Sequence, residues 1–364
     1  MVETLPPIAR WFAPLEPLVA AAGAWRRAFY RGRGAPRVIR LPMPVVSVGN
    51  LAVGGAGKTP MVEAIVEQLT RSGYTPGVVM RAYKARPPLQ PTENGAFWRR
   101  SLRWALVSDG EELYADVETA GDEAVMFALK HPAVPLAAGK DKARTALELA
   151  SEFPLDAIVL DDGFQSLRLA RDLNIVLLDA ARPLDNGRTL PAGFLRERPE
   201  ALADADIAVL VEGEESAEED SEAAIRPYLK STAPVVKARR VPSSLTSSGG
   251  ESLPLGELNG AEILGVCGIG NPRQYEASLR SLGARVEMMP FPDHRRYDSR
   301  DWDEIERAAG GRTVVATAKD AVKWEDGPRF PYLTLNIRME LDAPLDDILN
   351  SALKKAPLNL KANS

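Results

Sequence analysis

Short apolar runs, each bounded by polar or turn-forming residues, set the pattern of the chain from residue 44 onward. Runs typical of buried strands lie at residues 45–48, 77–80, 157–160, 175–178 and 207–211. A helical pattern covers residues 60–70, after the first run and a glycine-rich loop. Continuous apolar strands that alternate with helices indicate a mostly parallel sheet with helices on both faces. The pattern therefore predicts an α/β fold.

A break in this pattern predicts two α/β units. Residues 242–254 are rich in Ser and Gly and are typical of a connector between domains. A second alternation of strand and helix begins at residues 263–270 and returns at residues 313–317. We therefore expect an N-terminal segment, a larger domain and a smaller C-terminal α/β domain, at residues 1–40, 41–230 and 255–345.

Two stretches interrupt the larger unit. Residues 87–103 carry Pro, Arg and Trp without a clear period, which indicates a surface insertion. Residues 212–222 form a charged run, which is typical of a solvated helix or loop. Neither stretch predicts a site.

The first forty residues combine an apolar stretch with clustered arginines. Residues 11–30 are apolar but interrupted by Pro14, Glu16 and Pro17, so a helix that spans a membrane is disfavoured. Six arginines follow between residues 26 and 40. Such a segment could lie flat on an anionic membrane face. It could equally pack on the protein's own core and leave a solvated basic end, and the sequence leaves both alternatives open.

The composition excludes several classes of site. The chain has 364 residues and a net charge of -5, so a general attraction to nucleic acid is not expected. Cys267 is its only cysteine, which excludes an intrachain disulfide and argues against a cysteine-based zinc or iron–sulfur site. His131 and His294 are its only histidines, so a multi-histidine metal centre is not expected. These features indicate an intracellular protein.

A glycine-rich loop between the first predicted strand and helix is typical of a phosphate-binding site. Its residues are Gly54, Gly55, Ala56, Gly57, Lys58 and Thr59. The glycines allow backbone N–H groups to surround a phosphate chain at the start of a helix. Lys58 would reach the β- and γ-phosphates, and the Thr59 hydroxyl would bind Mg²⁺. Ala52 replaces a glycine of the strict pattern, and a simple turn with an incidental lysine is the alternative interpretation.

Two acids end the strand predicted at residues 157–160. Carboxylates at this position of a phosphate-loop enzyme lie near the Mg²⁺ of a bound triphosphate, and here they are Asp161 and Asp162. Paired acids can instead cap the next turn or helix. Together with the loop upstream, they favour a P-loop NTPase-type enzyme, without identifying the acceptor of the phosphoryl group.

The ordered motifs of the chain resemble those of the tetraacyldisaccharide 4'-kinases, the lipid A 4'-kinases of Gram-negative bacteria. The match begins at residues 46–51 and continues through the loop to Pro60. Further matching motifs are Gly121-Asp122-Glu123, Asp161-Asp162-Gly163-Phe164-Gln165, Asp185-Asn186-Gly187, Leu190-Pro191-Ala192-Gly193, Leu195-Arg196-Glu197, Gly268-Ile269-Gly270-Asn271-Pro272, Phe291-Pro292-Asp293-His294 and residues 317–323. The family shares the departure at Ala52.

This resemblance implies a kinase with its active site between a larger N-terminal and a smaller C-terminal domain. The implied reaction transfers the γ-phosphoryl group of ATP, with Mg²⁺, to the 4'-hydroxyl of tetraacyldisaccharide 1-phosphate and forms lipid IVA. The implied location is the cytoplasmic face of the bacterial inner membrane, with peripheral contact through the N-terminal segment. The partners are then ATP and an acylated disaccharide lipid, and no nucleic acid.

The resemblance also implies roles for particular residues. Asp122 is the base that accepts the proton of the attacking hydroxyl, and His294 is its partner, which orients it and tunes its basicity. Without the resemblance, His294 is more simply a loop histidine bonded to Asp293 or the backbone. Asp161 and Asp162 organise Mg²⁺ or its water shell, with Thr59 as the direct ligand.

Four more residues are candidates for nucleotide or phosphate contacts. Gln165 would position the nucleotide or the metal waters. Arg196 would stabilise charge on the transferring phosphoryl group, unless it forms a surface ion pair with Glu197 or Glu200. Arg81 and Lys319 are weaker candidates, because either could form an ordinary salt bridge.

Several positions depart from the family pattern. Two other functions stay open: the glycine-rich loop and Asp161 alone would permit one, and these departures suggest the other. The departures are Met80, Ala82, Lys84, Ala124, Ser166 and Arg295. The main alternative is a P-loop ATPase or GTPase that acts as a switch or metallochaperone, which needs no base for an acceptor hydroxyl. A non-catalytic relative is a third possibility, against which the retained Lys58, Thr59, Asp122 and His294 argue.

Overall fold

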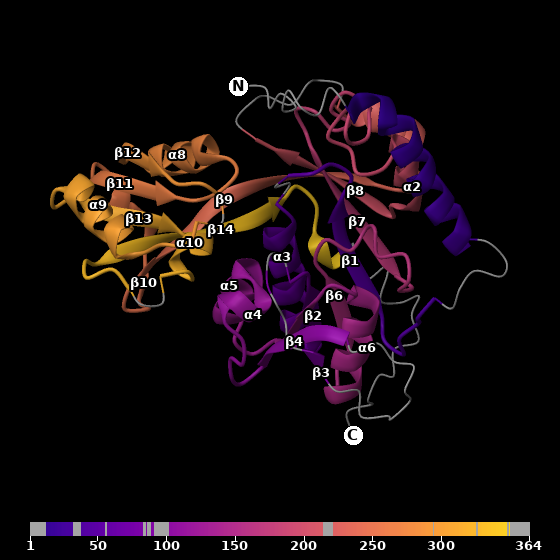
Figure 1. Cartoon of the computed structure of the whole chain (residues 1–364), viewed down its shortest axis with the longest axis horizontal. Coiled ribbons are helices and arrows are strands. Elements are labelled where there is room, and N and C mark those ends of the chain that lie inside the picture. The colour runs from indigo at the N-terminus through magenta and orange to yellow at the C-terminus, as the bar shows by residue number, and fades with distance from the viewer. Residues whose placement is uncertain are drawn as a thin grey trace.

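One long sheet runs through the whole molecule. The computed structural model describes residues 12–31, 38–54, 57–82, 85, 89–90, 102–213, 221–293, 295–324, 327–347 and 349. The sheet order is β12-β11-β13-β14-β9-β8-β7-β1-β6-β2-β5-β4-β3, and β10 pairs with β9. Figure 1 shows helices on both sides of this sheet and two lobes joined by β9 and β14. The predicted α/β class, with a mostly parallel sheet, is confirmed.

The strands are β1 (Val45–Asn50), β2 (Pro76–Met80), β3 (Leu89–Gln90), β4 (Leu102–Asp109), β5 (Pro135–Gly139), β6 (Ala157–Leu160), β7 (Leu173–Asp179), β8 (Ile207–Glu212), β9 (Val235–Ser247), β10 (Ser252–Leu253), β11 (Glu262–Cys267), β12 (Arg285–Pro290), β13 (Thr313–Thr317) and β14 (Tyr332–Leu341). The α-helices are α2 (Glu16–Arg31), α3 (Lys58–Arg71), α4 (Val117–Ala120), α5 (Asp122–Lys130), α6 (Lys142–Glu152), α7 (Ser221–Ile225), α8 (Pro272–Ser281), α9 (Ser299–Ala309) and α10 (Ala318–Ala321). Short 3-10 helices are η1 (Ala13–Leu15), η2 (Pro199–Asp204), η3 (Arg226–Tyr228) and η4 (Leu255–Leu258).

The core of the larger lobe forms because apolar strands are covered on both faces. Helix α3 buries Met61, Ile65 and Leu69 at helical spacing against one face, together with residues of α5. Helix α6 covers the opposite face, where Leu149 packs with strand residues such as Ile158. The predicted strands at residues 45–48, 77–80, 157–160, 175–178 and 207–211 are all confirmed.

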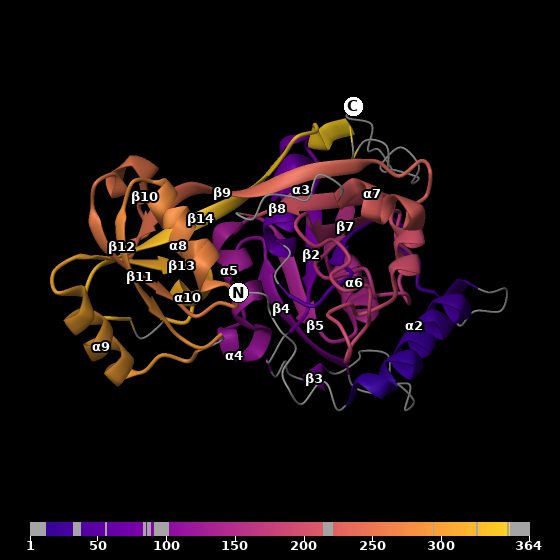
Figure 2. The ribbon, with the colours of Figure 1, turned by 90° about the horizontal axis from the view of Figure 1, so that it is seen from above.

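The smaller lobe repeats the same architecture on fewer strands. Strands β12, β11, β13 and β14 are parallel, with α8 and α9 packed on their two faces. Figure 2 shows this lobe beside the larger one, with α2 on the far side of the molecule. The domain boundaries at residues 40, 230 and 255 stay a prediction.

The connector between the lobes is a strand and not a flexible linker. Residues 242–254 were expected to form a Ser- and Gly-rich connector, but β9 continues to Ser247 and pairs antiparallel with β14 over most of its length. Four of the six residues 242–247 are Ser or Thr, and cross-strand pairing stabilises such a segment even without high apolar content. The two lobes therefore share a hydrogen-bonded ribbon.

Helix α2 packs on the larger lobe through its charged side. Glu16 and Arg27 are buried, whereas Trp25 is 66 % exposed, as are large parts of Leu18 and Phe29. The expectation of a solvated basic end is wrong for Arg27, which is only 5 % exposed. No helix among the described residues is long and apolar enough to cross a membrane.

Candidate active site

The candidate site lies where neighbouring parallel strands end. Strand β1 pairs with β6 so that Ser47 lies beside Leu160, and β6 pairs with β2. The phosphate loop follows β1, and Asp161 and Asp162 follow β6. Because parallel strands end at one edge of a sheet, these segments converge there.

The described part of the phosphate loop has the backbone that its glycines predict. Gly54 and Gly57 have φ of 117° and 78°, a region in which a side chain is strained. The Lys58 ammonium donates to the Gly54 carbonyl at 3.3 Å, so it folds back over the loop. Gly55 and Ala56 lie outside the described residues.

The two acids contact the loop and an arginine from a third segment. The Thr59 hydroxyl donates to Asp161 Oδ2 at 3.2 Å, and Lys58 Nζ lies 3.9 Å from Asp162 Oδ1. Arg196 donates to the same Asp162 oxygen at 2.7 Å. The alternative of a surface ion pair between Arg196 and Glu197 or Glu200 is therefore wrong. Five predicted site residues, Lys58, Thr59, Asp161, Asp162 and Arg196, therefore meet at one place.

The surroundings of the acid pair shift the pKa values of the two carboxylates in opposite directions. Burial raises the pKa of Asp161. Burial alone would also raise the pKa of Asp162, but the nearby cations Lys142, Lys58 and Arg196 lower it. Asp162 therefore stays ionised, while one carboxylate oxygen of Asp161, Oδ1, is buried and accepts no hydrogen bond from the described residues.

That buried oxygen fits a site for Mg²⁺. Carboxylate and hydroxyl oxygens are ligands that Mg²⁺ prefers, and Asp161 holds its unpartnered oxygen beside the Thr59 hydroxyl. No cluster of three or more His, Cys, Asp or Glu side chains suited to a metal occurs in the described part of the chain. A metal at this position would therefore need further oxygens, such as those of a bound phosphate chain.

The turn after β6 is held in place by close packing. Asp162 has φ of 52°, which is unusual for a residue with a side chain. A Cβ atom at Gly49 would lie 2.6 Å from the backbone nitrogen of Phe164, and one at Gly163 would lie 2.6 Å from Ser47 Oγ. The glycines allow the turn to lie directly against β1.

Lys142 secures the same turn and was not predicted from the sequence. Its buried ammonium, at the start of α6, donates to the carbonyl oxygens of both Asp161 and Asp162. Burial lowers the pKa of Lys142 to about 8. The available signal was its place three residues after a glycine-ended apolar run, Pro135–Gly139, which is strand β5.

Asp122 begins helix α5, which contacts helix α10 of the smaller lobe. Its side chain is 5 % exposed and accepts from the Glu123 backbone N–H at 3.0 Å. From the smaller lobe, Lys319 Nζ lies 3.1 Å from Asp293 and 3.9 Å from Glu123. His294 lies outside the described residues, so the predicted pair with Asp122 is not described.

Acidic and basic groups of the two lobes shift one another's pKa values. Burial alone would lower the pKa of Lys319, but Asp122, Glu123 and Asp293 raise it. Partial burial, with the negative charges of Asp161 and Asp122, raises the pKa of Glu123. Glu123 is a candidate site residue to which the sequence motif assigned no role, although it is adjacent to Asp122.

Gln165 and Arg81 take the remaining predicted positions. Gln165 donates to the Asn50 carbonyl at 3.0 Å, and its own side-chain oxygen lies 3.5 Å from Arg196. Arg81 follows β2, is exposed, and acts electrostatically on Lys142. Both residues therefore lie at the strand ends that form the site.

Comparisons with known proteins agree on one family. A family model described as tetraacyldisaccharide-1-P 4'-kinase matches residues 8–354. A "Tetraacyldisaccharide 4'-kinase" of Azotobacter vinelandii is 40% identical over 316 residues, which cover 85% of this chain and 82% of that protein. One of the same name from Syntrophus aciditrophicus is 38% identical over 313 residues, covering 82% and 79%.

A solved structure has the same fold. It is the "apo" form of LpxK from Aquifex aeolicus in complex with ATP, and it is 28% identical to this chain. The TM-score is 0.74, with 96% of this chain and 99% of that chain covered. The similarity therefore extends over both lobes.

Proposed function

The chain belongs to the tetraacyldisaccharide-1-P 4'-kinase family, and we propose that it transfers the γ-phosphoryl group of ATP to the 4'-hydroxyl of tetraacyldisaccharide 1-phosphate. The product is lipid IVA, in lipid A biosynthesis. The observation that carries the proposal is the convergence of Lys58 and Thr59 with Asp161, Asp162 and Arg196 at one edge of the sheet.

In this proposal, the phosphate loop and its neighbours bind the triphosphate. Backbone N–H groups at the start of α3 and the Lys58 ammonium bind phosphate oxygens. Arg196 stabilises charge on the transferring group, because a guanidinium matches phosphate geometry. Gln165 keeps Arg196 and the end of β1 in place.

Thr59, Asp161 and Asp162 are the residues that would hold Mg²⁺. The support is the buried, unpartnered oxygen of Asp161 beside the Thr59 hydroxyl. When bound, the ion neutralises charge on the phosphates during transfer. Lys142 keeps both acids in the orientation that this requires.

Asp122 acts as the base in the proposed transfer. As the sugar oxygen bonds to the γ-phosphorus and the bond to ADP breaks, the hydroxyl proton passes to the Asp122 carboxylate. The negative charge of this carboxylate helps to raise the pKa of Lys319, which reaches the site from the smaller lobe. By resemblance, His294 completes the pair by orienting Asp122.

We further propose that the protein contacts the cytoplasmic face of the inner membrane through α2. A helix with one apolar face and a basic neighbourhood binds in the plane of the interface. The exposed apolar side chains of α2 are Leu18, Val19, Trp25 and Phe29, and its charged side is occupied by the protein. Phe12 and Leu15, just before α2, add to this face.

A transfer assay tests the reaction. The full chain is incubated with γ-labelled ATP, Mg²⁺ and tetraacyldisaccharide 1-phosphate in mixed micelles, and the lipid is analysed for label. Asp122→Asn should lower turnover by about 100-fold or more, because general-base catalysis is lost, while ATP binding is kept. Glu118→Gln, on the adjacent helix α4, is the matched control and should have wild-type activity.

Two outcomes would contradict the proposal. If ATP is hydrolysed without lipid dependence and no label enters the lipid, the protein is an ATPase of the alternative class. If Asp122→Asn transfers phosphoryl groups as fast as the wild type, Asp122 is not the base.

A further inference from the structure

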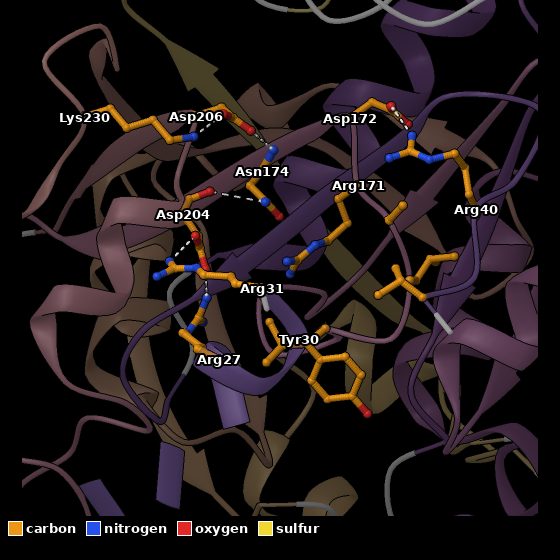
Figure 3. A pocket seen from close by; sticks show the side chains of 14 residues that line it. Arg27, Tyr30, Arg31, Arg40, Arg171, Asp172, Asn174, Asp204, Asp206 and Lys230 are labelled. Carbon is orange, nitrogen blue, oxygen red and sulfur yellow. Dashed lines mark hydrogen bonds and ion pairs between the residues drawn. The ribbon is translucent and has the colours of Figure 1, made fainter. Parts of the chain in front are cut away.

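A polar cavity of about 390 Å³ opens under the C-terminal end of α2, at the edge of the sheet opposite the phosphate loop. Arg40 precedes β1, and Asp172 and Asp206 precede β7 and β8, so the cavity lies at the starts of these strands. Figure 3 shows its charged side chains, with Arg171 in the middle of the group. The proposed kinase reaction uses none of them.

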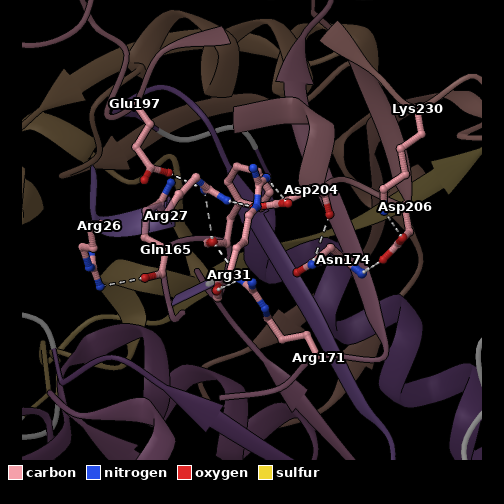
Figure 4. A network of polar contacts seen from close by, with 12 residues as sticks. Arg26, Arg27, Arg31, Gln165, Arg171, Asn174, Glu197, Asp204, Asp206 and Lys230 are labelled. Carbon is pink, nitrogen blue, oxygen red and sulfur yellow. Dashed lines mark hydrogen bonds and ion pairs between the residues drawn. The ribbon is translucent and has the colours of Figure 1, made fainter. Parts of the chain in front are cut away.

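Among the described residues, the ion pairs on and beside the cavity, one of which uses Glu197 from outside its lining, leave one positive charge unpaired. Arg27 pairs with Glu197 and Asp204, and Arg31 also pairs with Asp204, so two cations meet two anions (Figure 4). Two further pairs, Arg40 with Asp172 and Lys230 with Asp206, are each balanced.

The surplus charge belongs to Arg171. Among the described residues it forms no ion pair, and its guanidinium donates to the backbone carbonyl of Phe164 at 2.8 Å. Burial and the nearby Arg27 lower the pKa of Arg171 to about 10. An anion in the cavity would balance this charge.

The position of the cavity indicates which anion. Tyr30, in the last turn of α2, lines it, and the exposed Trp25 and Phe29 lie on the same helix, where their rings stack at 5.2 Å. If α2 lies in a membrane surface, the cavity opens at the level of the lipid headgroups. A phosphodiester is an anion, and the described lining of the cavity is net positive, with the five cations Arg27, Arg31, Arg40, Arg171 and Lys230 against the three carboxylates Asp172, Asp204 and Asp206.

We propose that this cavity binds the phosphodiester headgroup of an anionic phospholipid and so selects the membrane on which the enzyme works. The inference rests on the membrane contact of α2 proposed above. Arg171 is the buried anchor, and Arg31, Arg40 and Lys230, each at least 45 % exposed, form the rim.

Vesicle sedimentation tests the proposal with the full chain. Vesicles are made of phosphatidylcholine with or without phosphatidylglycerol. The wild type should prefer the anionic vesicles, and Arg40→Gln/Lys230→Gln should weaken binding to them about fivefold or more, because each basic group near an anionic surface contributes about that factor. The matched control is Arg285→Gln/Arg312→Gln, which removes two ion-paired arginines from the smaller lobe and should bind almost as well as the wild type.

Equal loss of binding in the two double variants would overturn the proposal, because only overall charge would then matter. Soluble glycerophosphoglycerol should compete with vesicles for the wild type more strongly than inorganic phosphate does. Equal competition by the two would assign the cavity to free phosphate and overturn the lipid assignment.

A separate variant tests the underlying membrane contact. Trp25→Ser/Phe29→Ser should lose binding to both kinds of vesicle. Unchanged vesicle binding by this variant would contradict the membrane contact through α2. If the wild type instead binds both kinds of vesicle equally well, only the cavity proposal is contradicted.

Discussion

Lys142 shows how much a single side chain determines in this site. One ammonium group bonds to two successive carbonyl oxygens and so fixes the turn on which Asp161 and Asp162 stand. The turn needs such support because Asp162 is held at a positive φ. The two acids are therefore held through their own backbone carbonyls.

Replacement of Lys142 should lower kcat strongly and change the denaturation midpoint little. In Lys142→Met the turn loses both hydrogen bonds, and a shift of the acids by about 1 Å costs about 100-fold in rate. Lys142→Arg is the control, because it keeps a charged donor and should recover most activity. The measurements are kcat in the transfer assay and the denaturation midpoint, and a Lys142→Met enzyme with normal kcat would contradict the assigned role.

At the scale of elements, α2 reverses the usual arrangement of an amphipathic helix. Glu16 and Arg27 are buried against the protein, whereas its large apolar residues Leu18, Trp25 and Phe29 are exposed. Arg27 makes this possible, because it bonds to Glu197 and Asp204 and lies over the Phe164 ring at 4.4 Å. The helix is thereby linked to the turn that carries the acids of the site.

Loss of Arg27 should therefore destabilise the protein strongly. Arg27→Met leaves the carboxylate of Glu197 buried without its ion pair, which costs about 3 kcal/mol or more in the free energy of unfolding. Arg31→Gln removes a partner that is 53 % exposed and should cost less than about 1 kcal/mol. Urea denaturation measures the free energy of unfolding of both variants. If the two variants lose similar amounts, the buried ion pair stabilises the protein no more than the exposed one does.

At the scale of the whole molecule, the ribbon of β9 and β14 joins two lobes whose charges meet at the site. Lys319 approaches Glu123 from the smaller lobe, and Lys130 of α5 bonds both to Glu63 of α3 and to the Ile337 carbonyl of β14. The phosphate-loop helix, the helix of the proposed base and the ribbon are thus in direct contact.

His131, at the end of α5, gives the fold a defined response to acid. Burial lowers the pKa of His131 to about 4, below its ordinary value near 6.5. Between these values the unfolded chain binds the proton and the folded chain does not, so stability falls as the pH is lowered from 6.5 toward 4. His131→Phe, which keeps a ring beside Phe127, should show a weaker loss of Tm over this window. If the Tm of His131→Phe depends on pH as strongly as that of the wild type, other titratable groups cause the loss of stability.

The local sequence predicted most of the parallel core, because an apolar run can become only a buried strand or helix, and the flanking glycines and spacing separate the two. The strands at the edges and in the ribbon escaped prediction, and so did the inner strand β5. Strand β9 mixes Arg, Ser and Thr with apolar residues, and its stability comes from pairing with β14, about ninety residues away. No local pattern contains that information.

For the site, the sequence by itself determined the chemistry: a phosphate loop, two acids after a strand, and family motifs in order. The tertiary structure decided the partners. Arg196 bonds to Asp162 and not to Glu197, and Lys142 bonds to the turn after β6. Arg27 is buried on a helix whose large apolar side chains are exposed. The physical reason is that a motif specifies side chains close in sequence, whereas ion pairs and burial depend on segments that only folding brings together.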